Sequence, residues 1–237
     1  MPLKRLTKPR FLFVYPLAVW LFFVARITDS SLRIGVIFIA MGQWLRLWAN
    51  GYVGHVKVNV TQPWRGDQKI GRLITGGPYA FVRHPLYLGT LLIGAGYSIA
   101  VGSVWFGALA LIGFFVTYRA KMAKEDELLR DECGPAYAAY RASVPAIIPA
   151  FRRYPRREGR WSWKGVAASK EWKTVIWNAV VVIAIYFWEE IRQEHQPLLG
   201  QHRLLRMGLI GIVVVLVMTD VVFELVQRSK KSLTPST

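Results

Sequence analysis

The sequence predicts an all-α protein, a polytopic membrane bundle of about six transmembrane helices, from three observations. Hydrophobic residues make up 53% of the 237 positions and charged residues only 19%, against about 25% charged in a typical soluble domain. Long uncharged runs recur, and the longest, residues 84–118, contains no Asp, Glu, Lys or Arg. The net charge of +17 is concentrated between these runs. A bilayer core of about 30 Å needs about 20 mostly apolar helical residues, so this pattern is typical of an integral membrane protein.

The apolar runs set the predicted spans in order. The run 84–118 is too long for one helix, and Gly102-Ser103 divides it into two. The first run follows a basic segment, but no small-x-small cleavage site comes after it, so we expect a retained helix and not a cleaved signal peptide. The six predicted spans are residues 11–27, 32–49, 86–101, 104–120, 174–190 and 206–226.

The distribution of Lys and Arg predicts the orientation. With the N-terminus inside, most basic residues fall in segments on the same side, including 51–85 and 119–173, as cytoplasmic loops require. Both termini are then cytoplasmic. The positive charge follows from orientation and from contact with anionic membrane lipids, so nucleic acid is not expected as a partner. The single cysteine, Cys133, excludes a disulfide scaffold.

Three segments follow along the chain. Residues 1–150 form the predicted core, 151–173 a basic, Trp-rich interfacial linker, and 174–237 a two-helix membrane extension. Within the core, residues 104–133 are predicted to form one long helix whose charged second half leaves the membrane. Gly134 and Pro135 end it, and a short amphipathic helix follows within 136–149.

The first candidate for chemistry is the loop before the third span. Gly76-Gly77-Pro78-Tyr79 precedes the stretch Arg83-His84-Pro85-Leu86-Tyr87-Leu88-Gly89. Proline suits the first helical turn, so Arg83 and His84 are placed at a helix N-terminus near the membrane boundary. The pattern fits either an interfacial belt of aromatic and basic residues or a pocket for a flat, polar cofactor.

Acidic residues supply the second candidate. Five of the fourteen fall within residues 125–132: Glu125, Asp126, Glu127, Asp131 and Glu132. They indicate either a solvated helix with i,i+4 ion pairs or a carboxylate that holds a cation near the membrane. Asp220 and Glu224 share one face of the last span, which leaves open a transport role or pairing with a basic residue. The histidines lack metal-ligand spacing, so no metal site is expected.

Two stretches, GPYAFVRHPLYLG and KEDELLRDECGPAYAAYRASVPAIIP, together resemble the isoprenylcysteine carboxyl methyltransferase and phospholipid methyltransferase family. The family pattern is G-P-Y-x5-H-P-x-Y-x-G, a helical hairpin, an acidic pair, a hydrophobic pair, Gly, Tyr-x-x-Tyr and a final Pro. Every part is present in order. The resemblance covers about residues 70–150, and the last two spans lie outside it.

The resemblance implies an integral membrane methyltransferase that uses S-adenosylmethionine, with a cytoplasmic cofactor pocket formed by loops and helix ends. The acceptor would be lipidic or a small apolar molecule, namely an isoprenylcysteine-like carboxylate, a phospholipid amine or a thiol. The implied cofactor contacts are Gly71, Arg72, Leu73, Ile74, Tyr79, His84, Pro85, Tyr87, Glu125 and Asp126.

The resemblance also assigns the catalytic positions. Carboxyl-methylating members carry a substrate arginine one turn before the glutamate, where this chain has Lys121, with Arg119 a half-turn away. Lysine keeps the charge but lacks the planar fork that matches a carboxylate. His84 could accept a proton from an amine acceptor. Two alternatives stay open, a sterol-reductase type of membrane reductase with a nicotinamide cofactor, and a non-enzymatic transport or assembly protein.

Overall fold

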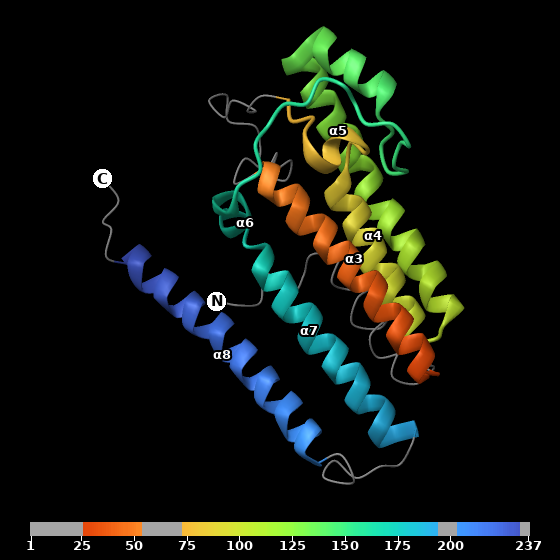
Figure 1. The fold of residues 1–237 in the computed structure, drawn as a ribbon, viewed down its shortest axis with the longest axis vertical. Coiled ribbons are helices and arrows are strands. Elements are labelled where there is room, and N and C mark those ends of the chain that lie inside the picture. Colours follow the sequence, from red (N-terminus) through yellow and green to blue (C-terminus); the bar gives the residue numbers. More distant parts are fainter. Residues whose placement is uncertain (1–25, 54–72, 194–202, 233–237) are drawn as a thin grey trace. The chain divides into compact units, whose positions relative to one another are not determined.

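The computed structural model describes residues 26–53, 73–193 and 203–232, and these are helical with connecting loops and no strand (Figure 1). The all-α class is therefore confirmed. The α-helices are α3 (Asp29–Val53), α4 (Pro85–Ala100), α5 (Val104–Ser143), α6 (Trp163–Ser169), α7 (Glu171–Trp188) and α8 (Arg203–Ser232). A 3-10 turn, η2 (Gly77–Ala80), precedes α4, and a π-helical turn, η3 (Glu189–Gln193), follows α7.

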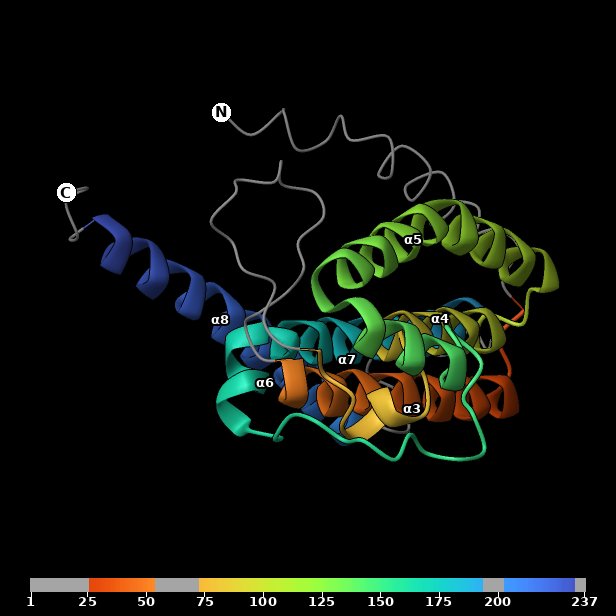
Figure 2. The same cartoon turned by 90° about the horizontal axis from the view of Figure 1, so that it is seen from above.

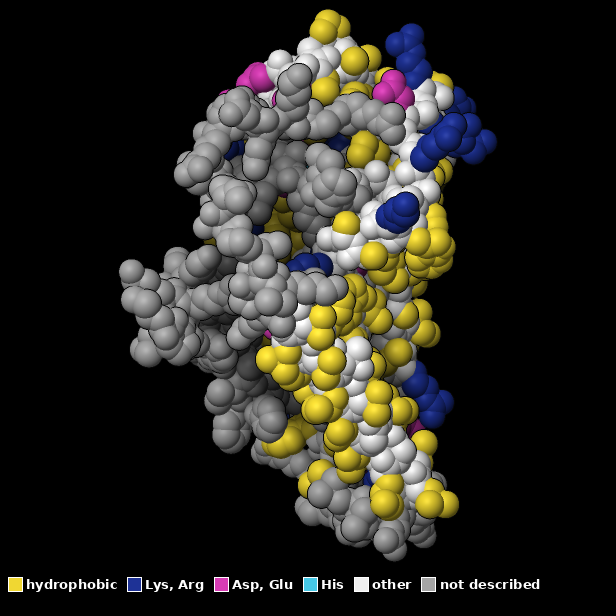
Figure 3. Space-filling model, turned by 90° about the vertical axis from the view of Figure 1, so that its left-hand side faces the viewer, with side chains coloured by type: hydrophobic (Ala, Val, Ile, Leu, Met, Phe, Trp, Pro, Cys, Tyr) yellow, Lys and Arg dark blue, Asp and Glu magenta, His cyan; other side chains and the backbone are white. Residues whose placement is uncertain are grey.

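Four helical segments are long and apolar enough to cross a membrane: Asp29–Val53, Val104–Ser143, Glu171–Ile191 and Leu204–Val226. They contain the predicted spans 32–49, 104–120, 174–190 and 206–226. The predicted span 86–101 corresponds to α4, a shorter apolar helix of 16 residues. The predicted span 11–27 lies outside the described residues except for its last two positions. Hydrophobic side chains cover much of the helical surface drawn in Figure 3, as contact with lipid requires.

The described residues divide into two compact units, Met1–Glu171 and Trp172–Thr237. In the first unit, α4 packs against both α3 and α5, and α6 packs against α3 (Figures 1 and 2). The first unit also contains the loops that carry the predicted cofactor contacts. The second unit consists of α7 after its first residue, η3 and α8.

Glycines bring the backbones of α3 and α4 into direct contact. A Cβ atom placed on Gly35 would lie 2.5 Å from the carbonyl oxygen of Gly96, and one on Gly42 would lie 2.6 Å from that of Gly89. These separations are too short for any side chain, so the two pairs allow the close approach of the helices. The approach places α3 directly beside the first turns of α4, which carry site residues.

The Gly96→Ala variant is expected to force α3 and α4 apart and to destabilise the protein by about 1–3 kcal/mol, the usual cost of overpacking. The added Cβ would lie 2.6 Å from Cγ1 of Ile39 and 2.7 Å from the oxygen of Gly35. Thermal unfolding in detergent, followed by intrinsic fluorescence, measures the change. Gly94→Ala is the control, because nothing lies within 4 Å of its Cβ position in the same helix. An equal loss in both variants would contradict direct backbone packing.

The α5 helix is broken at Gly134, as predicted. Its φ of 50° and ψ of −125° are non-helical, and they belong to a region that side chains strongly disfavour. The second part of the helix runs from Pro135 to Ser143 and overlaps the short helix predicted within 136–149. Val144 after it is extended. The following Pro145 accounts for this ending, because a residue before proline is driven out of the helical region.

Ion pairs join the two helices of the second unit. Lys173 Nζ lies 2.8 Å from Oδ1 of Asp220 and 2.6 Å from Oε2 of Glu224. Glu190, seventeen residues after Lys173, forms an ion pair with Arg206. At 1.5 Å per residue, about 25 Å of apolar helix separates the two pairs. The acids at 220 and 224, which the sequence left open to a transport role, therefore have a structural partner in this unit.

Candidate functional site

The loop before α4 has a fixed path. Gly77 has a φ of 59°, and a Cβ there would lie 2.1 Å from the ring of Tyr52, so only glycine fits. Pro78 is the second residue of the 3-10 turn η2, which contains Tyr79. Pro85 occupies the first turn of α4, with His84 as its N-cap, which is the position that the sequence predicted. The loop therefore presents His84 to α5 from the helix N-terminus.

Four charged side chains meet between this loop and α5. His84 Nε2 lies 3.0 Å from Oδ1 of Asp126, and its Nδ1 lies 3.5 Å from Oε2 of Glu125. Arg83 forms an ion pair with Asp126. Two tyrosines complete this four-charge cluster, as Tyr87 donates a 2.6 Å hydrogen bond to Oε1 of Glu125 and Tyr137 donates one to Oδ1 of Asp126.

The electrostatics of the cluster favour a charged histidine. Burial alone would lower the pKa of His84, but the hydrogen bonds to Asp126 and Glu125 outweigh it and raise the pKa above the ordinary 6.5. Both ring nitrogens face carboxylates, so both are placed to donate. Two cations then balance two carboxylates. Of the acids, Glu125 is the more accessible, with 21% of its side chain exposed against 12% for Asp126.

The break at Gly134 explains how Tyr137 reaches Asp126. Both residues lie on α5, eleven positions apart, and an unbroken helix would separate them by about 16 Å. The reversed direction of the chain also buries Tyr137 and Tyr140 against Ala80, Val144 and Tyr154. The Tyr140 hydroxyl donates a 2.7 Å bond to the carbonyl of Tyr79. The Tyr-x-x-Tyr pattern thus fixes the loop on which Tyr79 and His84 lie.

The structure brings together most of the predicted cofactor contacts that it describes. Tyr79, His84, Pro85, Tyr87, Glu125 and Asp126 belong to one connected group of side chains and loop atoms. Leu73 packs against the tyrosine cluster, and Ile74 is partly buried nearby. Gly71 and Arg72 lie outside the described residues.

The predicted substrate contacts, Lys121 and Arg119, differ from each other in their surroundings. The Lys121 ammonium lies 5.1 Å from the centre of the Tyr118 ring, and that ring lies 5.0 Å from the ring of Tyr87. The Tyr118 ring therefore lies between Lys121 and Tyr87, the residue that donates a hydrogen bond to Glu125. Arg119 is exposed. The sequence reasoning missed Tyr118 and Tyr137, because only the folded helices bring these rings to the cluster.

A groove of about 980 Å³ runs between α4 and α5 and ends near the cluster. Its walls are mainly apolar or small residues, and Thr90, Phe114, Thr117 and Tyr118 line it at the end closest to the charges. Since the Tyr118 ring contacts that of Tyr87, the groove leads toward Glu125.

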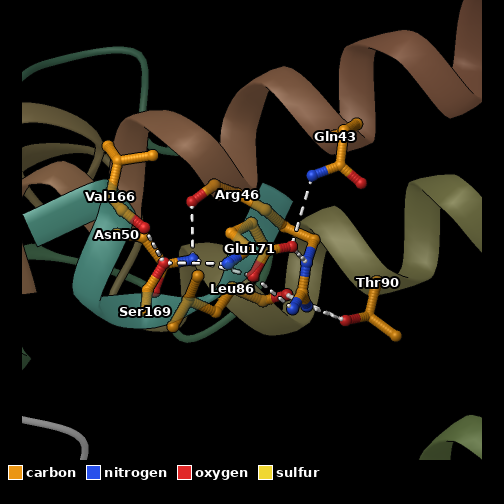
Figure 4. Close-up of polar contacts among 8 residues, drawn as sticks. All are labelled: Gln43, Arg46, Asn50, Leu86, Thr90, Val166, Ser169 and Glu171. Atoms are coloured by element: carbon orange, nitrogen blue, oxygen red, sulfur yellow. Dashed lines mark hydrogen bonds and ion pairs between the residues drawn. The ribbon is translucent and has the colours of Figure 1, made fainter. Parts of the chain in front are cut away.

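A second polar network joins Glu171 to α3 and to the first turns of α4 (Figure 4). Glu171, 2% exposed, receives bonds from Arg46 Nε at 2.6 Å and Nη2 at 3.0 Å. Its side chain also accepts from Gln43 and Asn50. Arg46 extends to α4, where its Nη1 donates to the Leu86 carbonyl at 3.1 Å and to the Thr90 hydroxyl at 2.6 Å. The sequence analysis did not identify this network, because its members lie up to 128 positions apart.

Comparisons of the sequence with known proteins indicate one family of enzymes. Residues 31–134 match the model of the phospholipid methyltransferase family. This match supports the resemblance to that family that the sequence predicted. The phospholipid methyltransferase match includes α3 from Ser31 onward, α4 and the part of α5 up to Gly134.

Individual relatives share between 26% and 29% of their residues with this chain over the matched regions. The chain is 29% identical over 136 residues to the cobalt-zinc-cadmium resistance protein CzcN of Cupriavidus metallidurans, covering 57% of this chain and 56% of that one. It is 26% identical over 162 residues to the nickel-cobalt-cadmium resistance protein NccN of Alcaligenes xylosoxydans xylosoxydans, covering 65% and 70%. It is 29% identical over 112 residues to the protein-S-isoprenylcysteine O-methyltransferase of Schizosaccharomyces pombe, covering 47% of each.

The chain thus spans about half the length of the first and third of these relatives. No solved structure matches it. Within the described residues, no group of three His, Cys, Asp or Glu side chains could hold a metal ion.

Proposed function

We propose that this protein is an integral membrane methyltransferase that uses S-adenosylmethionine and acts on an acceptor with an apolar chain. The observation that carries the proposal is the partly exposed carboxylate of Glu125, which Tyr87 and His84 hold. The ring of Tyr87 contacts Tyr118, which lines the apolar groove. The family match and the S-isoprenylcysteine O-methyltransferase relative support the same activity.

The residues present fit the cofactor. S-adenosylmethionine carries a sulfonium and an ammonium group, and Glu125 offers a carboxylate that attracts either one. Tyr79 and Tyr87 offer ring faces for the adenine or the cation. Burial raises the pKa of the Tyr79 hydroxyl, and the neighbouring Tyr140 and Glu125 raise it further, so this hydroxyl stays protonated. When bound, the cofactor supplies an electrophilic methyl group.

The chain's main task in such a transfer is alignment of the two reactants. Because both nitrogens of His84 face carboxylates, this ring is held as a donor. A ring that donates from both nitrogens has no free lone pair with which to act as general base for an amine acceptor. A carboxylate or thiolate acceptor needs no base at neutral pH. Lys121, near the end of the groove over Tyr118, can attract such an anion. We therefore favour an anionic group at the end of an apolar chain as the acceptor.

Calorimetry of S-adenosylmethionine binding to the detergent-purified protein tests the proposal. We expect a dissociation constant on the order of micromolar, weakened at least about tenfold in Glu125→Gln, which is about 1.4 kcal/mol. Glu127→Gln is the matched control, since Glu127 is an exposed acid on the same helix. A folded protein that binds a nicotinamide cofactor and not S-adenosylmethionine would contradict the proposal and support the reductase alternative.

A further inference from the structure

Residues 144–162, here called the strap, run from the end of α5 to the start of α6 and are bonded to the site loop through the backbone. Arg83 and His84 donate to the carbonyls of Pro145 and Ala146 at 2.8 and 3.0 Å. Four more bonds join the two segments: Ala150 to Phe81, Tyr154 to Ala80, and Thr75 and Gly76 to Glu158. The strap is therefore part of the support of the site loop.

The outer side of the strap is basic and apolar. Phe151 and Ile148 are 106% and 78% exposed. The strap contains five exposed arginines and a single acid, Glu158: the arginines are Arg152, Arg153, Arg156, Arg157 and Arg160. Across residues 26–53, 73–193 and 203–232, none of these guanidinium groups forms an ion pair. A solvated loop has no need of exposed Phe and Ile side chains beside five unpaired cations.

We expect the strap to lie at the level of the lipid headgroups, for two reasons. Ser162 donates a 2.9 Å backbone bond to Gly51, near the end of α3. The 25 residues of α3 extend about 37 Å, longer than the bilayer core of about 30 Å, so the end of α3 reaches the interface. Trp161 and Trp163, with ring centres 4.6 Å apart, are residues typical of that layer.

We propose that the strap binds the phosphate groups of anionic phospholipids, with Phe151 and Ile148 inserted among the acyl chains, and that this binding steadies the loop carrying His84. Guanidinium groups match phosphate oxygens in geometry as well as charge. Basic residues close to a membrane surface are each attracted to anionic lipid. The lipid-binding part of this proposal is independent of the proposed methyltransferase activity.

Native mass spectrometry of the protein released from nanodiscs tests the binding. The nanodiscs contain phosphatidylcholine alone or with about a third phosphatidylglycerol. We expect the wild type to retain phosphatidylglycerol and the triple variant Arg152→Gln, Arg153→Gln, Arg157→Gln to lose it, with affinity reduced on the order of fivefold for each arginine. The control triple variant, Lys124→Gln, Arg130→Gln, Arg141→Gln, removes the same charge from exposed positions on α5 and should retain the lipid.

Equal lipid loss from both triple variants would overturn the proposal, because net charge alone would then explain retention. Equal retention of phosphatidylcholine and phosphatidylglycerol by the wild type would equally contradict a site for anionic lipid. Hydrogen exchange of the backbone amides of residues 80–84 tests the second part. We expect slower exchange in phosphatidylglycerol nanodiscs for the wild type and no such effect in the strap variant. Identical exchange in both lipids would show that the strap does not steady the loop.

Discussion

The Glu171→Leu variant is expected to destabilise the protein by about 3–5 kcal/mol, the usual effect of removing one partner from a buried ion pair. The loss leaves the Arg46 guanidinium without the carboxylate that binds its Nε and Nη2 atoms at 2.6 and 3.0 Å. It also removes an acceptor from the amides of Gln43 and Asn50. Thermal unfolding in detergent, followed by intrinsic fluorescence, measures the change.

The double variant Arg46→Met, Glu171→Leu separates two explanations. Replacing both charges by apolar groups of similar size is often nearly neutral for stability, so most of the lost stability should return. The double variant still lacks the Arg46 bonds to Leu86 and Thr90 on α4, so affinity for S-adenosylmethionine should stay below that of the wild type. A double variant as unstable as the single one would contradict an unpaired buried charge as the cause.

The Asp126→Asn variant is expected to cost about 2–4 kcal/mol, because an ionised acceptor serves three donors at once. Arg83, His84 and Tyr137 all bond this carboxylate. An amide offers one acceptor and presents an NH₂ group to at least one of these donors. Thermal unfolding of Asp126→Asn beside Glu127→Gln tests this, since Glu127 is the exposed neighbour on the same helix and should change little.

The same cluster predicts a dependence of stability on pH. The pKa of His84 lies above its ordinary value in the folded protein, so the protonated ring binds its proton more tightly there than in the unfolded chain. Its contribution to stability is therefore complete below pH 6.5 and is lost as the pH rises through the raised pKa. Melting temperatures measured in one buffer series should fall across that range. In His84→Gln this fall should be absent, and an unchanged profile would contradict the assignment.

The sequence by itself determined the membrane class and, among its six predicted spans, the four long apolar helices. It also predicted which motif residues belong to one site. A long apolar run in a membrane must satisfy its backbone hydrogen bonds internally, and a helix does this within one segment. Pro85 and Gly134 are local signals for helix boundaries. Proline suits the first turn of a helix, and glycine adopts the non-helical backbone angles at which a helix breaks. Both lie where the structure begins α4 and breaks α5. The motif residues around His84 and Glu125 were found as a pattern along the chain, and the structure brings them together.

Only the tertiary structure decided which side chains complete the site. Tyr137 reaches Asp126 because the helix reverses at Gly134, and Glu171 reaches Arg46 across 125 positions. Neither contact has a local signal in the sequence. A hydrogen bond requires two segments to be positioned to within a few tenths of an ångström, whereas sequence periodicity predicts only which face of a helix a residue occupies. The groove beside Tyr118 likewise arises from the packing of two apolar helices. For Glu171 in particular, the sequence shows an ordinary acid at a helix start, and only its burial against three donor side chains of α3 makes it part of the support of the site.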